Sequence, residues 1–248
     1  MQWRHGLLFT GAVSILDYMS LKVEKHSRPR RGKTQSSNIS EGAILRAAES
    51  LFRLYGFGKV TMAEIAQEAG LGKASLYYYF PAKEHLFVAV VKALQVQFGA
   101  DIAAIMSRSG SATKQIREYV DQRFAYFDTL LSFRFMEMDP ALNRKPELSK
   151  AFAAFRQEEL ELVKKIFRKG KAAGEYSVDN IDFVAGTFLH LLHGLLLRYA
   201  HIEDLRSRAH PKAFNRLRAE VKMATSIYLQ GLTNNSSRRL RGTSTHPK

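Results

Sequence analysis

Residues Thr61 to Lys83, TMAEIAQEAGLGKASLYYYFPAK, decide the fold, because they encode two short helices around a glycine turn. Thr61 and Glu64 form a T-x-x-E capping box, in which the hydroxyl caps a free amide and the carboxylate reaches back to the helix start. Gly70 is expected to end this helix, since glycine adopts the left-handed conformation without steric penalty. Gly72 can begin the second helix. The stretch therefore predicts a helix-turn-helix.

The second helix, residues 73 to 80, is expected to present a basic and aromatic outer face. Leu76 and Phe80 lie four residues apart and share the inner face. The positions left facing outward are Lys73, Ala74, Tyr77 and Tyr78. Lysine can donate to guanine or phosphate, and tyrosine can donate to phosphate or touch a thymine methyl group. Three successive tyrosines cannot all be core residues, because they lie about 100° apart. This pattern predicts a helix that enters the major groove of DNA.

The next helix is expected to add an anion site. It starts near Pro81 and Lys83. Its free amides and the lysine ammonium suit a phosphate of the DNA backbone.

The segment from Ile44 to Phe87 resembles the N-terminal DNA-binding domain of the tetracycline-repressor (TetR) family. It contains Ile-Leu-x-x-Ala, Leu-Phe-x-x-x-Gly-Phe, Thr-x-x-x-Ile-Ala-x-x-Ala-Gly and Leu-Tyr-x-Tyr-Phe, followed by Lys-Glu. The resemblance implies base and phosphate contacts from the matching residues Thr61, Lys73, Ala74, Ser75, Tyr77, Tyr78, Tyr79 and Lys83. The chain departs from the family at Gly72, where a capping serine is more frequent, and at Tyr79, where many members have histidine.

Composition agrees with a helical, DNA-associated protein. The 248 residues include no cysteine and carry a formal charge of +15, which favours a polyanionic partner without choosing among DNA, RNA and anionic lipid. Helix-favouring residues predominate and no alternating strand pattern persists, so the expected class is all-α. With the resemblance, the prediction is about nine helices: a three-helix DNA-binding head and a C-terminal helical bundle for effector binding and dimerisation.

Four segments are expected along the chain. Residues 1–37 form a disordered basic tail, 38–98 the DNA-binding domain, 99–233 the effector and dimerisation domain, and 234–248 a second disordered tail. The first tail contains an apolar piece, residues 6–16, without a convincing cleavage site, and Met19 offers a second start. Its arginines, around residues 28–31, suit either a solvated tail or an arm along DNA.

The expected helices after the head span residues 84–106, 112–135, 140–143, 146–173, 179–201 and 211–232. The last two have apolar faces with small residues, and these faces predict a homodimer seam of two helices per subunit. An intramolecular core is the alternative. The seam residues predicted are Gly186, Leu191, Gly194, Leu195, Leu217, Val221, Ala224 and Tyr228.

Aromatic residues are abundant in the second domain. They suit a plain core, but together with the resemblance they predict a largely apolar cavity for a small hydrophobic or amphipathic effector. The candidate ligand-binding residues are Phe98, Phe124, Phe127, Met136, Phe152, Phe155, Phe188 and His190.

No enzymatic or cofactor chemistry is expected. His190 and His193 have a spacing that can grip a metal, but no third ligand is identifiable, so an interior or pocket histidine is favoured. No nucleophile elbow, phosphate loop or HExxH motif occurs. The sequence therefore predicts a cytoplasmic regulator, a repressor in the first instance, that binds double-stranded operator DNA as a homodimer and does not contact membranes. An architectural or adaptor DNA-binding protein without an effector is the alternative.

Overall fold

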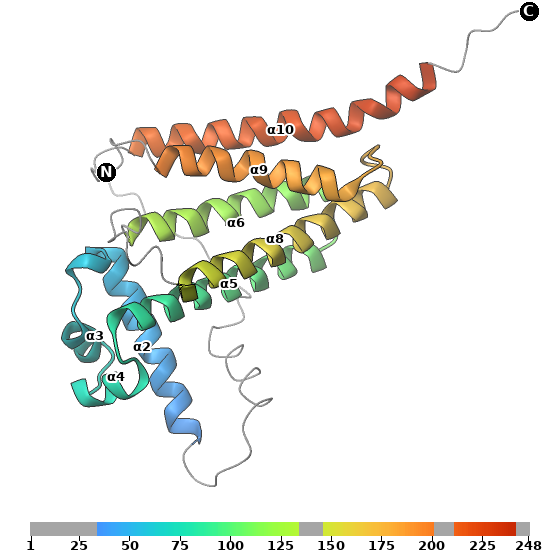
Figure 1. Cartoon of the computed structure of the whole chain (residues 1–248). Helices are drawn as coiled ribbons and strands as arrows, with labels where there is room; N and C mark the ends of the chain where they lie inside the picture. The colour runs from blue at the N-terminus through green and yellow to red at the C-terminus, as the bar shows by residue number, and fades with distance from the viewer. Residues whose placement is uncertain (1–33, 134–145, 201–210, 242–248) are drawn as a thin grey trace, which may run out of the picture.

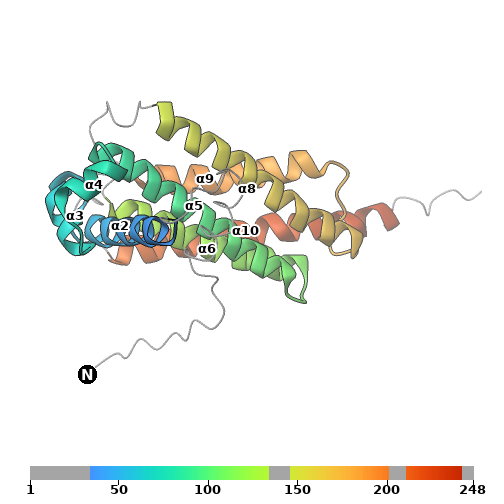
Figure 2. The ribbon, with the colours of Figure 1, turned by 90° about the horizontal axis from the view of Figure 1, so that it is seen from below.

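The computed structural model describes residues 34–133, 146–200 and 211–241. Over these ranges it contains eight α-helices, one 3-10 helix and no strand, so the predicted all-α class is confirmed. The elements of the head are α2 (Thr34–Tyr55), η1 (Phe57–Lys59), α3 (Met62–Glu68) and α4 (Lys73–Tyr79). Those of the body are α6 (Ala112–Ser132), α8 (Pro146–Ala172), α9 (Ile181–Ala200) and α10 (Pro211–Arg241). The long helix α5 (Lys83–Ser107) joins the two, and the head lies at one end of the body (Figures 1 and 2).

Two helices extend further than the sequence indicated. α2 begins at Thr34, within the expected N-terminal tail, and α10 continues to Arg241, beyond the expected domain end at residue 233. Neither glycine nor proline interrupts residues 232–241, and Gly242 follows the last helical residue. The predicted DNA-following arm, the helix at 140–143 and the candidate ligand residue Met136 lie outside the described residues.

The head core is an aromatic cluster that includes one residue of the body. Phe52 and Phe87 lie with their ring centroids 5.8 Å apart. Phe133, directly after α6, is fully buried between them, at 6.0 and 6.1 Å from the two rings. The backbone amide of Phe57 also donates to the carbonyl of Phe133. The end of α6 is therefore fixed into the head by packing and by a hydrogen bond.

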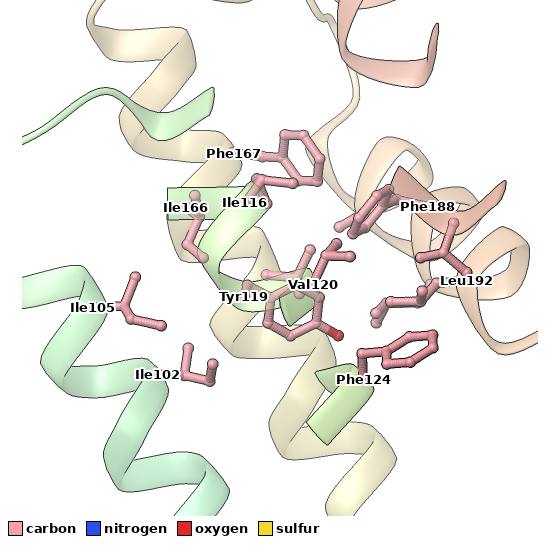
Figure 3. Packing of buried hydrophobic residues seen from close by; sticks show 14 of the residues in the cluster. Ile102, Ile105, Ile116, Tyr119, Val120, Phe124, Ile166, Phe167, Phe188 and Leu192 are labelled. Carbon is pink, nitrogen blue, oxygen red and sulfur yellow. The ribbon is translucent and has the colours of Figure 1, made fainter. Parts of the chain in front are cut away.

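The body core is built from α5, α6, α8, α9 and α10. Figure 3 shows its centre, where Tyr119 and Ile116 of α6 face Ile102 of α5, Phe167 of α8 and Phe188 of α9. All five side chains are almost completely buried.

α5 is long and apolar enough, by length and composition alone, to cross a membrane. In the fold it is a core helix, because it packs against α2 in the head and against α6 and α8 in the body. Its buried residues, among them Leu86, Val91 and Ile102, belong to the two hydrophobic cores. Burial between layers therefore explains its apolar composition.

The turn between α8 and α9 packs against the start of α6, at the end of the body away from the head. Gly174 has a φ of 73°, a left-handed conformation that glycine tolerates. The Glu175 carboxylate then accepts from the free amides of Ala112 and Thr113 at 2.7 and 3.0 Å, which caps α6. Tyr176 packs directly over Gly170, so a larger residue has no room there.

Candidate nucleic-acid interface

α3 begins with the predicted capping box. The Thr61 hydroxyl accepts from the Glu64 amide at 3.3 Å, and the Glu64 carboxylate accepts from the Thr61 amide at 2.8 Å. The Thr61 hydroxyl also donates to the Glu64 carboxylate at 2.8 Å, and this bond, together with that from the Thr61 amide, lowers the pKa of the Glu64 carboxyl. Gly70 ends the helix with a φ of 67°, and the Leu71 amide donates to the Ala66 carbonyl. The local sequence thus fixes the angle between α3 and α4.

α4 presents the outer face that the sequence predicted. Leu76 is fully buried and anchors the helix on the head core, whereas Tyr78 is 85% exposed and Tyr77 42% exposed. Lys73, Ala74 and Ser75 are also exposed. Gly72 precedes the helix without any side-chain cap, as expected for a glycine at this position. A lysine, small residues and tyrosine hydroxyls therefore share one accessible surface, the α4 surface.

Tyr79 lies at the edge of the α4 surface. Its ring is partly buried and meets Tyr78 edge to face, with ring centroids 5.5 Å apart.

Lys83 has a role that sequence reasoning missed. Its ammonium donates to the carbonyls of Phe57 and Val60 at 2.9 and 2.7 Å and lies 4.4 Å from the centre of the Phe57 ring. Burial lowers the pKa of the ammonium, although Glu84 and Glu64 oppose this shift. Lys83 therefore ties the start of α5 to the turn before α3. Its predicted phosphate contact stays a prediction, to be met by the remaining donor of the ammonium.

The predicted seam residues divide between two environments. Leu191 is exposed, and a Cβ atom at Gly186 or Gly194 would meet no other atom within 4 Å. Leu217 and Val221, in contrast, are buried inside the chain.

The other three seam candidates pack partly or wholly within the subunit. Leu195 packs against the body core, and Ala224 is partly buried. Tyr228 donates to the Val184 carbonyl at 2.7 Å, and its ring packs on Phe188.

The open face of α9 and α10 also carries apolar side chains that the sequence prediction did not include. Phe183, Met223 and Ile227 are 71%, 67% and 63% exposed. These helices form one outer layer of the body (Figure 1). Together they form the α9/α10 face, which comprises Phe183, Gly186, Leu191, Gly194, Met223 and Ile227.

A cavity of about 460 Å³ lies in the body. Phe127, Phe152 and Phe155 line it, as predicted. Its other lining residues are Arg123, Tyr126, Leu130, Leu131, Leu148, Ser149, Arg156, His193, Leu196 and Leu197. Size and lining suit one small, largely apolar ligand.

Four candidate ligand residues lie elsewhere. Phe98, Phe124 and Phe188 are buried core residues and do not line the cavity, because their rings pack against Tyr119, Phe214 and Tyr228. His190 is exposed, while His193, one helical turn on, faces the cavity. Among the described residues, no group of three His, Cys, Asp or Glu side chains is placed to hold a metal.

A buried carboxylate stands behind the cavity wall. Glu159 is fully buried and accepts from the Tyr119 hydroxyl at 2.6 Å, from Arg123 Nε at 2.7 Å and from His193 Nε2 at 3.0 Å. Burial alone would raise the pKa of Glu159, but the Arg123 guanidinium and the His193 hydrogen bond outweigh it and lower the pKa. The carboxylate is therefore ionised at neutral pH, and His193 must donate through Nε2.

The cavity adjoins the head. Leu130, Leu148 and Phe152 line the cavity and also pack in or against the hydrophobic core of the head. Arg53 of α2 donates to the Thr129 hydroxyl of α6 at 3.2 Å beside the same junction. A ligand in the cavity would therefore contact side chains that support the head.

The fold and the α4 surface define a helix-turn-helix regulator of transcription. Residues 44–90 match the family model described as bacterial regulatory proteins, tetR family. A transcriptional regulator from Cytophaga hutchinsonii is 32% identical, with a TM-score of 0.70 over 77% of this chain and 97% of that protein. The chain belongs to the TetR family.

Two curated relatives match different lengths of the chain. The transcriptional regulator RutR of Escherichia coli K12 is 38% identical over 60 residues, which span 24% of this chain and 28% of RutR. The regulator YfiR of Bacillus subtilis is 24% identical over 194 residues, or 75% of this chain and 88% of YfiR.

Proposed function

We propose that this protein is a cytoplasmic repressor that binds a palindromic operator as a homodimer and releases it when a small hydrophobic or amphipathic effector occupies the cavity. The observation that carries the proposal is the exposed α4 surface. Lys73 and Ser75 provide donors to bases and phosphates, Ala74 leaves room for close approach, and the Tyr77 and Tyr78 hydroxyls reach outward. Thr61, Tyr79 and Lys83 are assigned to phosphate contacts at its margin.

Dimerisation would occur through the α9/α10 face. Its exposed apolar side chains would be removed from water, and its two glycines would allow close helix approach. One head makes few contacts, whereas two heads on half-sites about one helical turn apart read a palindrome.

Effector control would act through the junction between cavity and head. Leu130, Leu148 and Phe152 contact both, and Phe133 anchors α6 in the head. An effector that binds better to the non-DNA-binding geometry would shift the heads apart, with a coupling free energy of about 1–3 kcal/mol. The cavity favours this function over the architectural or adaptor alternative.

Selection from random duplex DNA tests the proposal. The purified protein should enrich a palindromic sequence. Ile227→Asp, which places a charge on the α9/α10 face, should yield a folded monomer by analytical ultracentrifugation that binds the selected duplex far more weakly. Ala103→Asp, at an exposed position of α5, is the matched control and should remain dimeric. Enrichment of a non-palindromic sequence, or unchanged binding by a monomeric variant, would contradict dimeric operator recognition.

A further inference from the structure

The cavity lining is largely apolar and includes two arginines. Its polar lining residues are Arg123, Ser149, Arg156 and His193, and no carboxylate is among its described lining residues. The rest of the lining consists mainly of leucine and aromatic side chains, including Leu131 and Phe152. A ligand that fills this cavity would therefore be mostly apolar with a polar group.

The charge among the described lining residues is not fully balanced. Glu159 neutralises Arg123 through a 2.7 Å ion pair. Arg156, which also lines the cavity, is exposed and makes no ion pair with any described residue. Among the described lining residues, the positive charge of Arg156 is therefore not neutralised by a carboxylate.

The cavity lining also holds a buried donor without an acceptor. Arg123 donates through Nε to Glu159, but its Nη1 is buried and has no hydrogen-bond partner. The guanidinium lies 5.3 Å from the Tyr126 ring centre. Burial raises the pKa of Tyr126 to about 12, although a hydrogen bond with the Gln95 side chain opposes this shift.

Unpaired buried donors are destabilising, because they lose water without gaining another acceptor. A carboxylate supplies acceptor oxygens and one negative charge, which match the Arg123 Nη1 donor and the unpaired charge of Arg156. A neutral carbonyl would satisfy the donor but not the charge, and an amine would be repelled. A rotation of the Arg123 side chain would be needed to bring the buried Nη1 to the cavity surface.

We propose that the effector is a hydrophobic carboxylic acid, bound as its anion with the carboxylate at Arg123 and Arg156 and the apolar part against Leu131 and Phe152. This inference rests on the proposed effector function of the cavity and assigns the chemical class of its ligand. Glu159 holds the Arg123 side chain in place and is therefore a positioning residue.

Three ligands of equal chain length test it: decanoate, decanamide and decylamine. Isothermal titration of the full-length protein should show that decanoate binds roughly tenfold or more tightly than decanamide, because hydrogen bonds to charged groups are the stronger ones. Decylamine should bind most weakly. Leu131→Trp, which fills the cavity, should abolish binding of all three, and this result would place them in the cavity.

Two variants separate charge from structure. Arg156→Gln removes an exposed charge and should weaken decanoate binding several-fold without changing decanamide binding. Arg123→Gln combined with Glu159→Gln removes the buried pair without leaving a lone charge, so the protein should fold, and it should lose at least tenfold in decanoate affinity alone. Equal losses for decanoate and decanamide would assign these arginines a merely structural role.

Failure of this inference differs from failure of the proposed function. Decanamide that binds as tightly as decanoate and releases the selected operator would overturn the carboxylate preference and leave effector control intact. If none of the three binds and operator occupancy never changes, the cavity is not an effector site and the inference falls with it.

Discussion

The head and the body place their polar groups in opposite ways. In the head, Thr61 and Lys83 bond to backbone groups near the surface and fix short helices in position. In the body, Glu159 lies in the core and collects three donors from α6 and α9. The outer surface of the head thus remains accessible to a macromolecule, whereas Arg123 and His193, which hold the buried carboxylate, also line the cavity of the body. This difference agrees with DNA recognition by one region and ligand binding by the other.

The largest expected effect is on the buried carboxylate of the body. Glu159→Ala leaves Arg123 buried without its counter-charge, and it should lower the free energy of unfolding by about 3–5 kcal/mol. The double variant Arg123→Gln with Glu159→Gln should be much closer to wild type. Urea unfolding followed by circular dichroism measures both. If the single variant is as stable as wild type, the pair does not hold the body together.

The same carboxylate predicts a pH dependence. The folded pKa of Glu159 lies below its ordinary value of 4.5, so the unfolded chain binds a proton first as the pH falls. The stabilisation is therefore complete well above pH 4.5 and is lost as the pH drops through the folded pKa. The free energy of unfolding of wild type, minus that of the double variant, should therefore fall on acidification. A value that rises would contradict an ionised Glu159 in the folded protein.

The next effect concerns close packing at the far end of the body. A Cβ atom at Gly170 would lie 2.8 Å from the Ala112 Cβ and would overlap the Tyr176 ring. Gly170→Ala should therefore cost about 1–3 kcal/mol of stability through overpacking. Gly99→Ala, where a Cβ meets nothing within 4 Å, should stabilise α5 by about 0.5–1 kcal/mol. Equal melting temperatures of the two variants would rule out the close approach.

A smaller effect separates two lysines of the head. Lys83→Ala removes two hydrogen bonds to backbone carbonyls and should lower stability by about 1–2 kcal/mol. It should also weaken binding to specific and non-specific DNA by the same factor, and it should make the affinity less dependent on salt concentration. Lys73→Ala, on the exposed surface, should leave the melting temperature unchanged and reduce operator discrimination. Thermal unfolding and salt-dependent titrations of both variants decide between these roles.

The head could be predicted from the sequence more fully than the body. The α3 cap, the Gly70 turn and the exposed side chains of α4 depend on residues within one short segment, so local rules were sufficient. The Lys83 contacts reach back 26 and 23 residues, and local patterns do not contain such pairings.

The body was harder to predict for the same reason. The seam residues Leu217 and Val221 are apolar at helical spacing, which does not reveal whether a face packs within the subunit or against another. Glu159 did leave a signal, since it occupies a position four residues from both Phe155 and Val163 in an apolar stripe of α8. A lone carboxylate at such a position indicates a buried polar network.

The most direct test of the central claim, that the α4 surface reads bases, is a fluorescence anisotropy titration of wild type and Tyr77→Ala against the selected operator and a scrambled duplex. We predict that Tyr77→Ala lowers operator affinity by about 1–3 kcal/mol while binding to the scrambled duplex hardly changes. The ratio of the two affinities would then fall toward one. A ratio equal to that of wild type would contradict the claim.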